Sequence, residues 1–392
     1  MKEKIRQNGE LHELMKTWRH TLHRHPETAF EEVKTADTIA ELLRGFSGLS
    51  VHTGLAKTGI VAVLTGNQGD NGRMIGLRAD IDALDISEEG EAAYRSTIAG
   101  KMHACGHDGH TTMLLGAAKY LSEHPDFAGK IAFIFQPAEE NAGGGDVMCK
   151  EGLFEQFPCE AVFGMHNWPG LPAGHFAVHE REVMASTDSF DVMIEGSGAH
   201  AAMPNLGIDP MVVAAQLINA FQTIVSRSVA PTDTAVVSVT KMDAGSAYNI
   251  IPSRVTFCGT IRSFSHSVRD TIQTLMAQQV DLICRAFGAT GSIRFHDAYP
   301  ATINHPEQAR ICADVLKNMV GEQRLHLDMP PSMGAEDFSY MLMEKPGAYI
   351  WLGNGEDSYS LHHAKYDFND DILPVGASYW VALSYHYLQS PI

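Results

Sequence analysis

The chain has 392 residues, of which 44% are hydrophobic and 19% are charged, and its formal net charge is −18. These proportions exclude a disordered chain, a coiled coil and a collagen-like fibre. The acidic balance excludes nucleic acid and anionic membranes as main partners, because both need a basic face. The N-terminal segment lacks the apolar core of a signal peptide, and no run of about 18 apolar residues occurs. We therefore expect a cytoplasmic protein with no membrane span, and the six cysteines, which contain no CxxC pair, are expected to be free thiols.

Helices and strands are predicted to alternate over the first 165 residues. Apolar residues recur at helical spacing over 10–24, and a second helix is expected over 30–44, where Gly45 ends it. Continuous apolar runs predict strands at 59–65, 74–79, 130–135 and 161–165, and helices are expected at 108–122 and 146–155. This alternation is typical of a mostly parallel sheet that is covered by helices on both faces.

The pattern changes after about residue 185. We expect a strand at 189–195, a helix at 208–227, strands at 234–242 and 255–262, a helix at 267–287 and a strand at 292–295. The order βαββαβ is that of a ferredoxin-like α+β sandwich. Residues after 300 return to α/β character, with a helix after Pro306, a strand at 348–352 and a last helix near 374–388. We therefore predict an α/β catalytic domain over 1–185 and 297–392, interrupted by an inserted domain over 186–296.

Residues of the metal-binding type gather where predicted strands end. In open α/β sheets, ligands bind outside the carboxyl ends of the strands. One such residue is more often structural than a ligand, but several at one sheet edge favour a metal site. The segments concerned are 77–82, 102–110, 136–140, 164–168 and, much later in the chain, 360–363.

Two pairs of residues make the metal interpretation specific. Cys105 and His107 are two positions apart, so on an extended segment both point the same way. Glu139 and Glu140 directly follow an apolar run, and neighbours on a strand point to opposite sides, so one can bind metal while the other reaches a water. The alternatives are a small buried hydrophobe at Cys105 and a solvated face at the glutamates. Thiolate, imidazole and carboxylate together suit Zn²⁺ best, with Mn²⁺ or Co²⁺ as alternatives.

Five sequence motifs resemble those of a known family. They are MHACGHDGH at 102–110, PAEE at 137–140, GMHNWP at 164–169, GSGAHAAMP at 196–204 and GAEDF at 334–338. The chain resembles the aminoacylase/glutamate carboxypeptidase metallopeptidase family. More narrowly, it is similar to the N-acyl-amino-acid amidohydrolase branch, which includes hippurate hydrolases and plant indole-acetyl-amino-acid hydrolases. The resemblance extends from 24–27 to 366–370, which is nearly the whole chain.

The resemblance implies two divalent metal ions per subunit and a role for each matching residue. It implies Glu139 as the general base and His200, on the insert, as an electrophilic partner for the scissile carbonyl. Asn249 and Arg262, also on the insert, are implied to bind the substrate carboxylate. The implied metal ligands are Cys105, His107, Glu140, His166 and His362. The family also uses the insert as a lid and dimerisation domain.

Some positions depart from the family pattern. Asp80 lies in Arg78-Ala79-Asp80, where the wider family has His-x-Asp, and we expect it to orient a ligand rather than to bind metal. His363 competes with His362 for the last ligand position. Asn205 occupies a position where a second histidine is common. These departures leave the acyl pocket unassigned.

The resulting hypothesis is a metal-dependent hydrolase that splits the amide bond of hippurate-like N-acyl amino acids. Metal binding lowers the pKa of water to about 7, and a general base then contributes about 10²–10⁴ in rate. One alternative is a dipeptidase or carboxypeptidase of the same fold, and another is a catalytically silent metal-binding or ligand-binding protein. The expected partners are the small-molecule substrate and further copies of the chain, in a homodimer or a higher homo-oligomer. Whether His200 acts in its own subunit or in a neighbour stays open.

Overall fold

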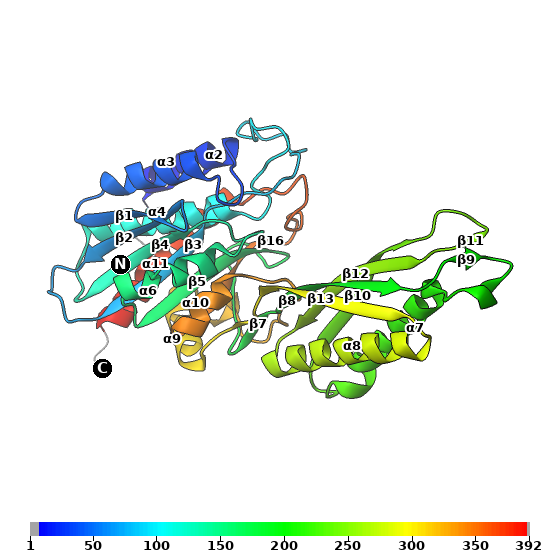
Figure 1. Ribbon diagram of the computed structural model, residues 1–392. Coiled ribbons are helices and arrows are strands. Elements are labelled where there is room, and N and C mark those ends of the chain that lie inside the picture. Colours follow the sequence, from blue (N-terminus) through cyan, green and yellow to red (C-terminus); the bar gives the residue numbers. More distant parts are fainter. Residues whose placement is uncertain (1–7, 390–392) are drawn as a thin grey trace. The chain divides into compact units, whose positions relative to one another are not determined.

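The computed structural model describes residues 8–389, except for the side chains at positions 297 and 298 (Figure 1). The chain divides into two compact units, which we describe separately. The first comprises Met1–Val183, Ile303–Pro330 and Asp337–Ile392, and the second comprises Met184–Thr302 and Pro331–Glu336. None of the helices in the described range is long and apolar enough to cross a membrane. All six cysteines are described, and all are free.

An eight-stranded sheet forms the centre of the first unit, in the order β1-β2-β4-β3-β5-β16-β6-β15. Strand β3 runs parallel to both β4 and β5, and β5 runs parallel to β16, so the carboxyl ends of these four strands meet at one edge. The pairs β1·β2, β2·β4 and β16·β6 are antiparallel. The strands are β1 (Leu49–Leu55), β2 (Gly59–Thr65), β3 (Met74–Asp80), β4 (Lys130–Gln136), β5 (Ala161–Pro169), β6 (Phe176–Val178), β15 (Leu325–His326) and β16 (Gly347–Gly355).

Helices cover both faces of this sheet. On one face, Leu77 of β3 belongs to a core that also contains residues of α2, α3, α4, α9 and α11. On the other face, the guanidinium of Arg78 lies 5.7 Å from the ring of Phe338, at the start of α10. The expected mostly parallel sheet between helical layers is therefore confirmed. The helices are α2 (Gly9–Arg24), α3 (Val33–Arg44), α4 (His107–Glu123), α5 (Gly144–Lys150), α6 (Leu153–Gln156), α9 (Pro306–Val320), α10 (Phe338–Glu344) and α11 (Leu373–Gln389).

One predicted helix of the first unit is wrong as a single element. The region expected as a helix over 146–155 forms two short helices, α5 and α6. They are separated at Gly152, whose φ of 90° is left-handed and cannot continue a right-handed helix. Strand β1 was not predicted, because its mixed, half-exposed residues show no apolar run.

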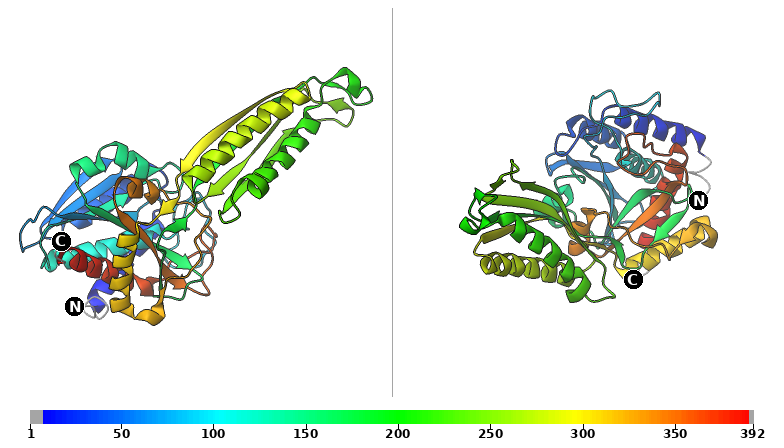
Figure 2. Two further views of the ribbon diagram at one scale, coloured as in Figure 1. Left: turned by 90° about the horizontal axis from the view of Figure 1, so that it is seen from below. Right: turned by 90° about the vertical axis from the view of Figure 1, so that its right-hand side faces the viewer.

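The second unit has the predicted βαββαβ order and a four-stranded antiparallel sheet, β10-β12-β8-β13. Phe190, Val192 and Ile194 of β8 are buried, whereas the residues between them are exposed. Helices α7 and α8 pack on the buried face and lie side by side (Figure 2). The elements are β8 (Thr187–Glu195), α7 (Pro210–Thr223), β10 (Ala235–Ala244), β12 (Arg254–Ser263), α8 (His266–Ala286) and β13 (Thr290–Tyr299).

Several short elements complete the chain. A two-stranded sheet in the second unit pairs β9 (Ala199–His200) with β11 (Ile250–Ile251). Strands β7 (Glu182–Met184) and β14 (Thr302–Ile303) lie where the chain passes between the two units. Single helical turns occur at Pro204–Leu206, Ile224–Ser228, Glu322–Arg324 and Asp370–Ile372.

Candidate metal centre

The predicted metal ligands lie in the first unit, around the carboxyl ends of its central strands. Cys105 and His107 flank the start of α4, Glu140 follows β4, His166 belongs to β5, and His362 lies in the loop after β16. The turn between the first two depends on Gly106, whose φ of 96° is left-handed. A Cβ atom on Gly106 would lie 2.2 Å from Asn167 Oδ1, so only glycine fits there. We expected an extended segment here, and this is wrong, because Gly106 is left-handed and α4 begins at His107. The turn at the glycine nevertheless brings both side chains to the site.

The structure brings all five of these side chains together, with Glu139 beside them. Cys105 Sγ lies 3.3 Å from His166 Nε2, and His107 Nε2 lies 3.8 Å from Glu140 Oε1. His362 Nε2 is 3.3 Å from the same Glu140 oxygen. The potential ligand atoms form overlapping groups, within each of which all atoms lie within 4.8 Å of one another: Cys105, His107 and His166; Cys105, Glu140 and His362; and His107, Glu139 and Glu140.

Two atoms in this cluster fit a cation. Among the described residues, His107 Nε2 and Glu140 Oε1 are buried polar atoms without a hydrogen-bond partner. Buried polar groups of folded proteins normally have partners, so each such atom needs an explanation. A divalent ion bound to both the imidazole nitrogen and the carboxylate oxygen would explain why these two atoms lack hydrogen-bond partners. The cysteine sulfur nearby suits Zn²⁺ in particular.

Hydrogen bonds leave the Nε2 atom of two histidines directed at the cluster. His107 Nδ1–H donates to the carbonyl oxygen of Asp82 at 3.0 Å and to its Oδ1 at 3.1 Å. His166 Nδ1–H donates to the carbonyl oxygen of Asn167 at 2.6 Å. Partners on the far nitrogen fix both the tautomer and the ring orientation of a metal-binding histidine. The second carboxylate oxygen of Asp82 accepts the N–H of Glu140 at 3.0 Å, so Asp82 holds two parts of the site.

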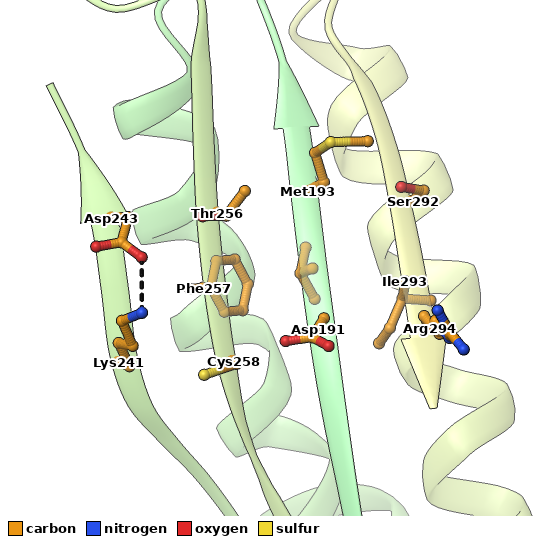
Figure 3. Close-up of a pocket in the computed structure, with 11 residues that line it drawn as sticks. Asp191, Met193, Lys241, Asp243, Thr256, Phe257, Cys258, Ser292, Ile293 and Arg294 are labelled. Carbon is orange, nitrogen blue, oxygen red and sulfur yellow. Dashed lines mark ion pairs between the residues drawn. The ribbon is translucent and has the colours of Figure 1, made fainter. Parts of the chain in front are cut away.

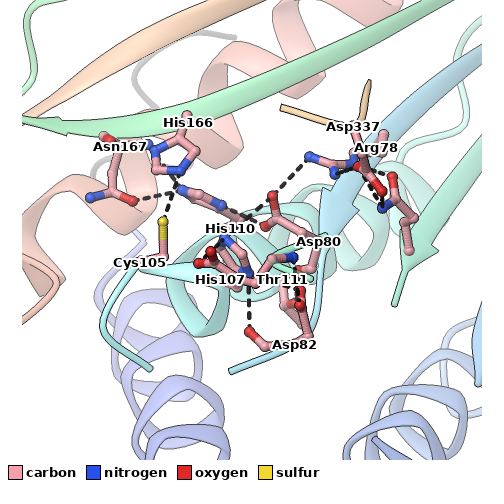
Figure 4. A network of polar contacts seen from close by, with 12 residues as sticks. Arg78, Asp80, Asp82, Cys105, His107, His110, Thr111, His166, Asn167 and Asp337 are labelled. Carbon is pink, nitrogen blue, oxygen red and sulfur yellow. Dashed lines mark hydrogen bonds and ion pairs between the residues drawn. The ribbon is translucent and has the colours of Figure 1, made fainter. Parts of the chain in front are cut away.

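Asp80 has a different place from the one that we expected. It accepts hydrogen bonds from Arg78 Nη1 at 2.8 Å and from His110 Nδ1–H at 2.6 Å, and its Oδ2 lies 3.7 Å from His107 Nε2 (Figure 4). The partner that orients His107 is thus Asp82, which sequence reasoning missed. The signal for it was present, because Asp82 ends the same strand-end segment two positions after Asp80.

A second layer of hydrogen bonds connects the loops that carry the ligands. The N–H of Asn167 donates to His110 Nε2 at 2.9 Å, and Asn167 Nδ2 donates to the hydroxyl of Tyr366 at 2.6 Å. His110 is itself held by Asp80. This chain of contacts ties the start of α4, the end of β5 and the loop after β16 to one another. Figure 4 shows the part that runs from Asp80 through His110 to Asn167.

The buried charges around the cluster are predominantly negative. Burial, together with Glu140 and Glu139, raises the pKa of the Cys105 thiol well above its usual range. Burial lowers the pKa of His107, but Asp80 and Asp82 outweigh it and raise that pKa to about 10. Both shifts arise from carboxylates crowded in a region of low dielectric constant, and such a region favours a bound cation.

Glu139 is buried beside the ligand cluster, with 5% of its surface exposed. We expected Glu139 and Glu140 to point to opposite sides of a strand, and this premise is wrong, because both lie in a turn after β4. The turn follows Ala138, whose φ of 55° is left-handed. As a result, both glutamates place an oxygen within 4.8 Å of the His107 ligand atom.

The two neighbouring histidines after β16 have different surroundings. His362 has a left-handed φ of 64°, and its N–H donates to the carbonyl oxygen of Ala104 at 2.8 Å. This conformation directs its ring to Glu140. His363 Nδ1 instead accepts the N–H of Lys365 at 3.0 Å. Of the two rings, only that of His362 belongs to the candidate metal-binding groups of the described residues.

The remaining predicted residues lie on the second unit. His200 pairs with Ile250 across β9 and β11, and the carbonyl oxygen of Asn249 accepts the N–H of Ala201 at 3.0 Å, so His200 and Asn249 are close together. Arg262 is half-buried and lies near the opposite end of β12 from β11. Their roles toward a substrate stay predictions.

The open face of the second unit's sheet carries a pocket of about 500 Å³ (Figure 3). Its lining mixes charges of both signs, including Asp191, Arg294 and the ion pair of Lys241 with Asp243 at 3.1 Å. Among the described residues, none of the candidate metal-binding groups includes a residue of this pocket. The five predicted metal ligands therefore all lie outside this pocket.

Comparisons with known proteins agree on one family. The model of peptidase family M20/M25/M40 matches residues 76–386. Hippurate hydrolase of Campylobacter jejuni is 39% identical over 95% of this chain and 96% of its own length. N-acetylcysteine deacetylase of Bacillus subtilis is 35% identical over 93% of this chain and 94% of its own length. The solved structure of the Bacillus subtilis YXEP protein, described as a dinuclear metal binding peptidase of this family, superposes with a TM-score of 0.86 at 32% identity, covering 98% of this chain and 100% of that one.

Proposed function

The chain belongs to peptidase family M20/M25/M40 and is an amidohydrolase, and we propose that it hydrolyses N-acyl amino acids to a carboxylic acid and a free amino acid. The observation that carries this proposal is the pair of buried atoms His107 Nε2 and Glu140 Oε1, both without a hydrogen-bond partner among the described residues, with Glu139 beside them. A relative that is a hippurate hydrolase and another that is an N-acetylcysteine deacetylase support an N-acyl amino acid as substrate. They differ in the acyl group, so the proposal covers aromatic and short acyl chains alike.

The proposed cofactors are two divalent ions per subunit, Zn²⁺ or Mn²⁺, with Co²⁺ as an alternative. The overlapping ligand groups and the dinuclear relative support this number. When bound, such ions supply Lewis-acid chemistry, because they polarise a carbonyl oxygen and lower the pKa of water. The residues that would hold them are Cys105, His107, Glu140, His166 and His362.

Glu139 is the proposed general base. It takes a proton from the attacking water and delivers it to the leaving nitrogen, a transfer that contributes about 10²–10⁴ in rate. Its burial supports this role, because exclusion of water strengthens the electrostatic interactions of a carboxylate. The second unit would supply His200 for the developing oxyanion. Asn249 and Arg262 would bind the substrate carboxylate, for which the planar guanidinium offers two parallel donors.

The proposed division of labour follows the predicted domains. Residues 1–185 and 297–392 would form the catalytic domain, and 186–296 would form the lid and the dimerisation surface. We propose a homodimer or a higher homo-oligomer, which light scattering of the purified protein would detect.

The test uses purified protein with reductant and either Mn²⁺ or Zn²⁺, and a mixed panel of N-acyl amino acids and dipeptides that is followed by mass spectrometry. We expect loss of particular N-acyl amino acids, and we expect a chelator to abolish it. Replacement E139Q should keep the metal content and lower turnover by about 10²-fold or more. Cleavage of dipeptides alone would contradict the proposed substrate class, and unchanged turnover in E139Q would contradict the mechanism.

His362 and His363 give a matched pair of variants for the metal site. H362A should lower the metal content, because its ring contacts Glu140, whereas H363A should leave it unchanged, because its ring bonds to Lys365. The opposite result would transfer the ligand role to His363.

A further inference from the structure

The turn that carries Glu139 has an unfavourable backbone conformation. Ala138 directly precedes Glu139, is fully buried and has a φ of 55°. A residue with a Cβ atom rarely adopts the left-handed region, and such residues persist only where the surroundings hold them. Something outside the turn must therefore fix Ala138.

The carboxylate of Glu32 is the group in contact with this residue. Glu32 Oε1 accepts the N–H of Ala138 at 3.0 Å, and Glu32 Oε2 accepts the hydroxyl of Thr58 at 2.8 Å. The Glu32 side chain is fully buried. Glu32 is the N-cap residue of α3, yet its side chain makes no capping hydrogen bond to that helix. Its carboxylate thus serves a turn 106 residues away in the sequence rather than its own helix.

The turn is also held on the other side of Glu139. Asp82 Oδ2 accepts the N–H of Glu140 at 3.0 Å, and the carbonyl oxygen of Ala138 accepts the N–H of Gly144 at 3.1 Å. The amides that flank Glu139 are therefore each bound to a carboxylate from another part of the first unit. Glu139 has little freedom to move as long as both carboxylates are in place.

From this arrangement we propose that Glu32 is a positioning residue for Glu139, holding Ala138 in the left-handed conformation that presents the Glu139 carboxylate to the metal centre. The inference rests on the proposed function, in which Glu139 is the general base. Loss of the Glu32 carboxylate leaves the buried N–H of Ala138 without its acceptor and lets the turn relax. Glu139 then moves, while the ligands His107 and His166 keep their own hydrogen bonds.

Glutamine at position 32 can reproduce both contacts of the carboxylate. Its amide oxygen can accept the N–H of Ala138, and its NH₂ group can donate to the Thr58 hydroxyl, which accepts as well as donates. Burial raises the pKa of Glu32, so this environment favours the neutral form more than water does. Alanine at the same position removes both contacts.

The experiment compares E32A, E32Q and the control E27A as metal-loaded, full-length enzymes. E32A should lower kcat by about ten-fold to a hundred-fold, because small displacements of a catalytic group cost that much, and leave KM within about two-fold. Its metal content should equal that of the unmodified protein, and E32Q should keep most of the activity. Glu27 is the matched control because its carboxylate accepts hydrogen bonds from Thr35 at the start of the same helix and, within the described part of the chain, makes none to the turn that carries Glu139. E27A should therefore leave kcat unchanged even where it lowers the melting temperature.

Two further measurements separate positioning from a general loss of structure. Hydrogen exchange of the peptide that spans residues 136–141 should speed up in E32A and not in E32Q or E27A. The double variant E32A/A138G should recover part of the lost kcat, because glycine adopts the left-handed conformation without support. Equal loss of kcat in E32A and E27A would overturn the inference, and so would an E32Q enzyme as inactive as E32A.

The E139Q variant distinguishes this inference from the proposed function. A large loss of turnover in E139Q together with unchanged turnover in E32A overturns the inference alone. Unchanged turnover in E139Q overturns the proposed function and, with it, the role of Glu32. In the E139Q background, E32A should add no further loss, because no base remains to be positioned. A further loss of the same size as in the unmodified background would show that Glu32 acts elsewhere.

Discussion

Asp82 is the residue on which two parts of the metal centre converge. Its Oδ1 accepts a hydrogen bond from His107 Nδ1–H, and its Oδ2 accepts one from the N–H of Glu140. The carboxylate thus fixes the ring of one proposed ligand and the backbone of another. Partners of this kind affect a metal site nearly as much as the ligands themselves.

The replacement D82N tests this role. Asparagine keeps the shape of the side chain but turns one of its two acceptors into a donor. Either the N–H of Glu140 loses its acceptor, or His107 keeps only the backbone carbonyl oxygen of residue 82. We expect metal affinity to fall by about 10–100-fold, measured by competition with a chelator of known affinity. Asp85 provides a control close in the sequence, because its side chain is 70% exposed and pairs with Lys101. D85N should leave metal affinity unchanged, and an equal loss in both variants would rule out a specific role for Asp82.

At the scale of the secondary-structure elements, the start of α4 is fixed by close packing against the C-terminal part of the chain. A Cβ atom on Gly109 would lie 2.2–2.5 Å from ring atoms of Phe368. Gly116, two turns later, would place a Cβ atom 2.7 Å from the sulfur of Met15. The first neighbour is a rigid ring, whereas the second is a flexible thioether chain that can move.

The two glycines of α4 therefore predict different outcomes for the same substitution. G109A should destabilise the fold by about 1–3 kcal/mol, as overpacking does in a tight core. It should also weaken metal binding, because the displaced helix start carries His107. G116A should lower the free energy of unfolding by less than G109A does, and it should leave metal affinity unchanged. Urea unfolding and chelator competition measure the two effects, and equal metal affinities in both variants would show that the start of α4 tolerates the shift.

Individual strands and helices also show which parts of the fold can be predicted from sequence. Continuous apolar runs at 59–65 and 130–135 predicted buried strands, and both are confirmed as β2 and β4. Strand β1 has no such run, and it is therefore recognisable only from its antiparallel pairing with β2 in the structure. The break between α5 and α6 depends on the left-handed conformation of a single glycine, which an apolar pattern does not reveal.

The candidate site divides in a similar way. Close spacing and strand-end positions directed attention to Cys105, His107 and the two glutamates, which are near one another in the structure. Apart from Asp82, which ends one of the same strand-end segments, the groups that hold them could not be found in this way. Glu32 contacts a residue 106 positions away, and the ring of His110 bonds to the backbone of Asn167, 57 positions away. Hydrogen bonds between segments so far apart depend on the folded sheet and leave no local pattern in the sequence.

At the scale of the whole molecule, each of the two units contains a hydrophobic core of its own among the residues that the structure describes. The first joins the large sheet to α2, α3, α4, α9 and α11. The second joins the four-stranded sheet to α7 and α8, with Phe221 at its centre between Phe190 and Phe257. Chains with more than one core commonly unfold in more than one step. The ligand cluster around Cys105 belongs entirely to the first unit.

These two cores predict that metal removal and a core substitution act on different unfolding transitions. A ligand that binds the native state stabilises only the unit that binds it. In calorimetry, a chelator should therefore lower the midpoint temperature of the first unit's unfolding transition and leave that of the second unit unchanged. F221A should do the reverse, since truncation of a buried phenylalanine costs about 3–5 kcal/mol in the unit that contains it. A single transition that both treatments shift equally would mean that the units unfold as one, and metal bound in the first would then stabilise the second as well.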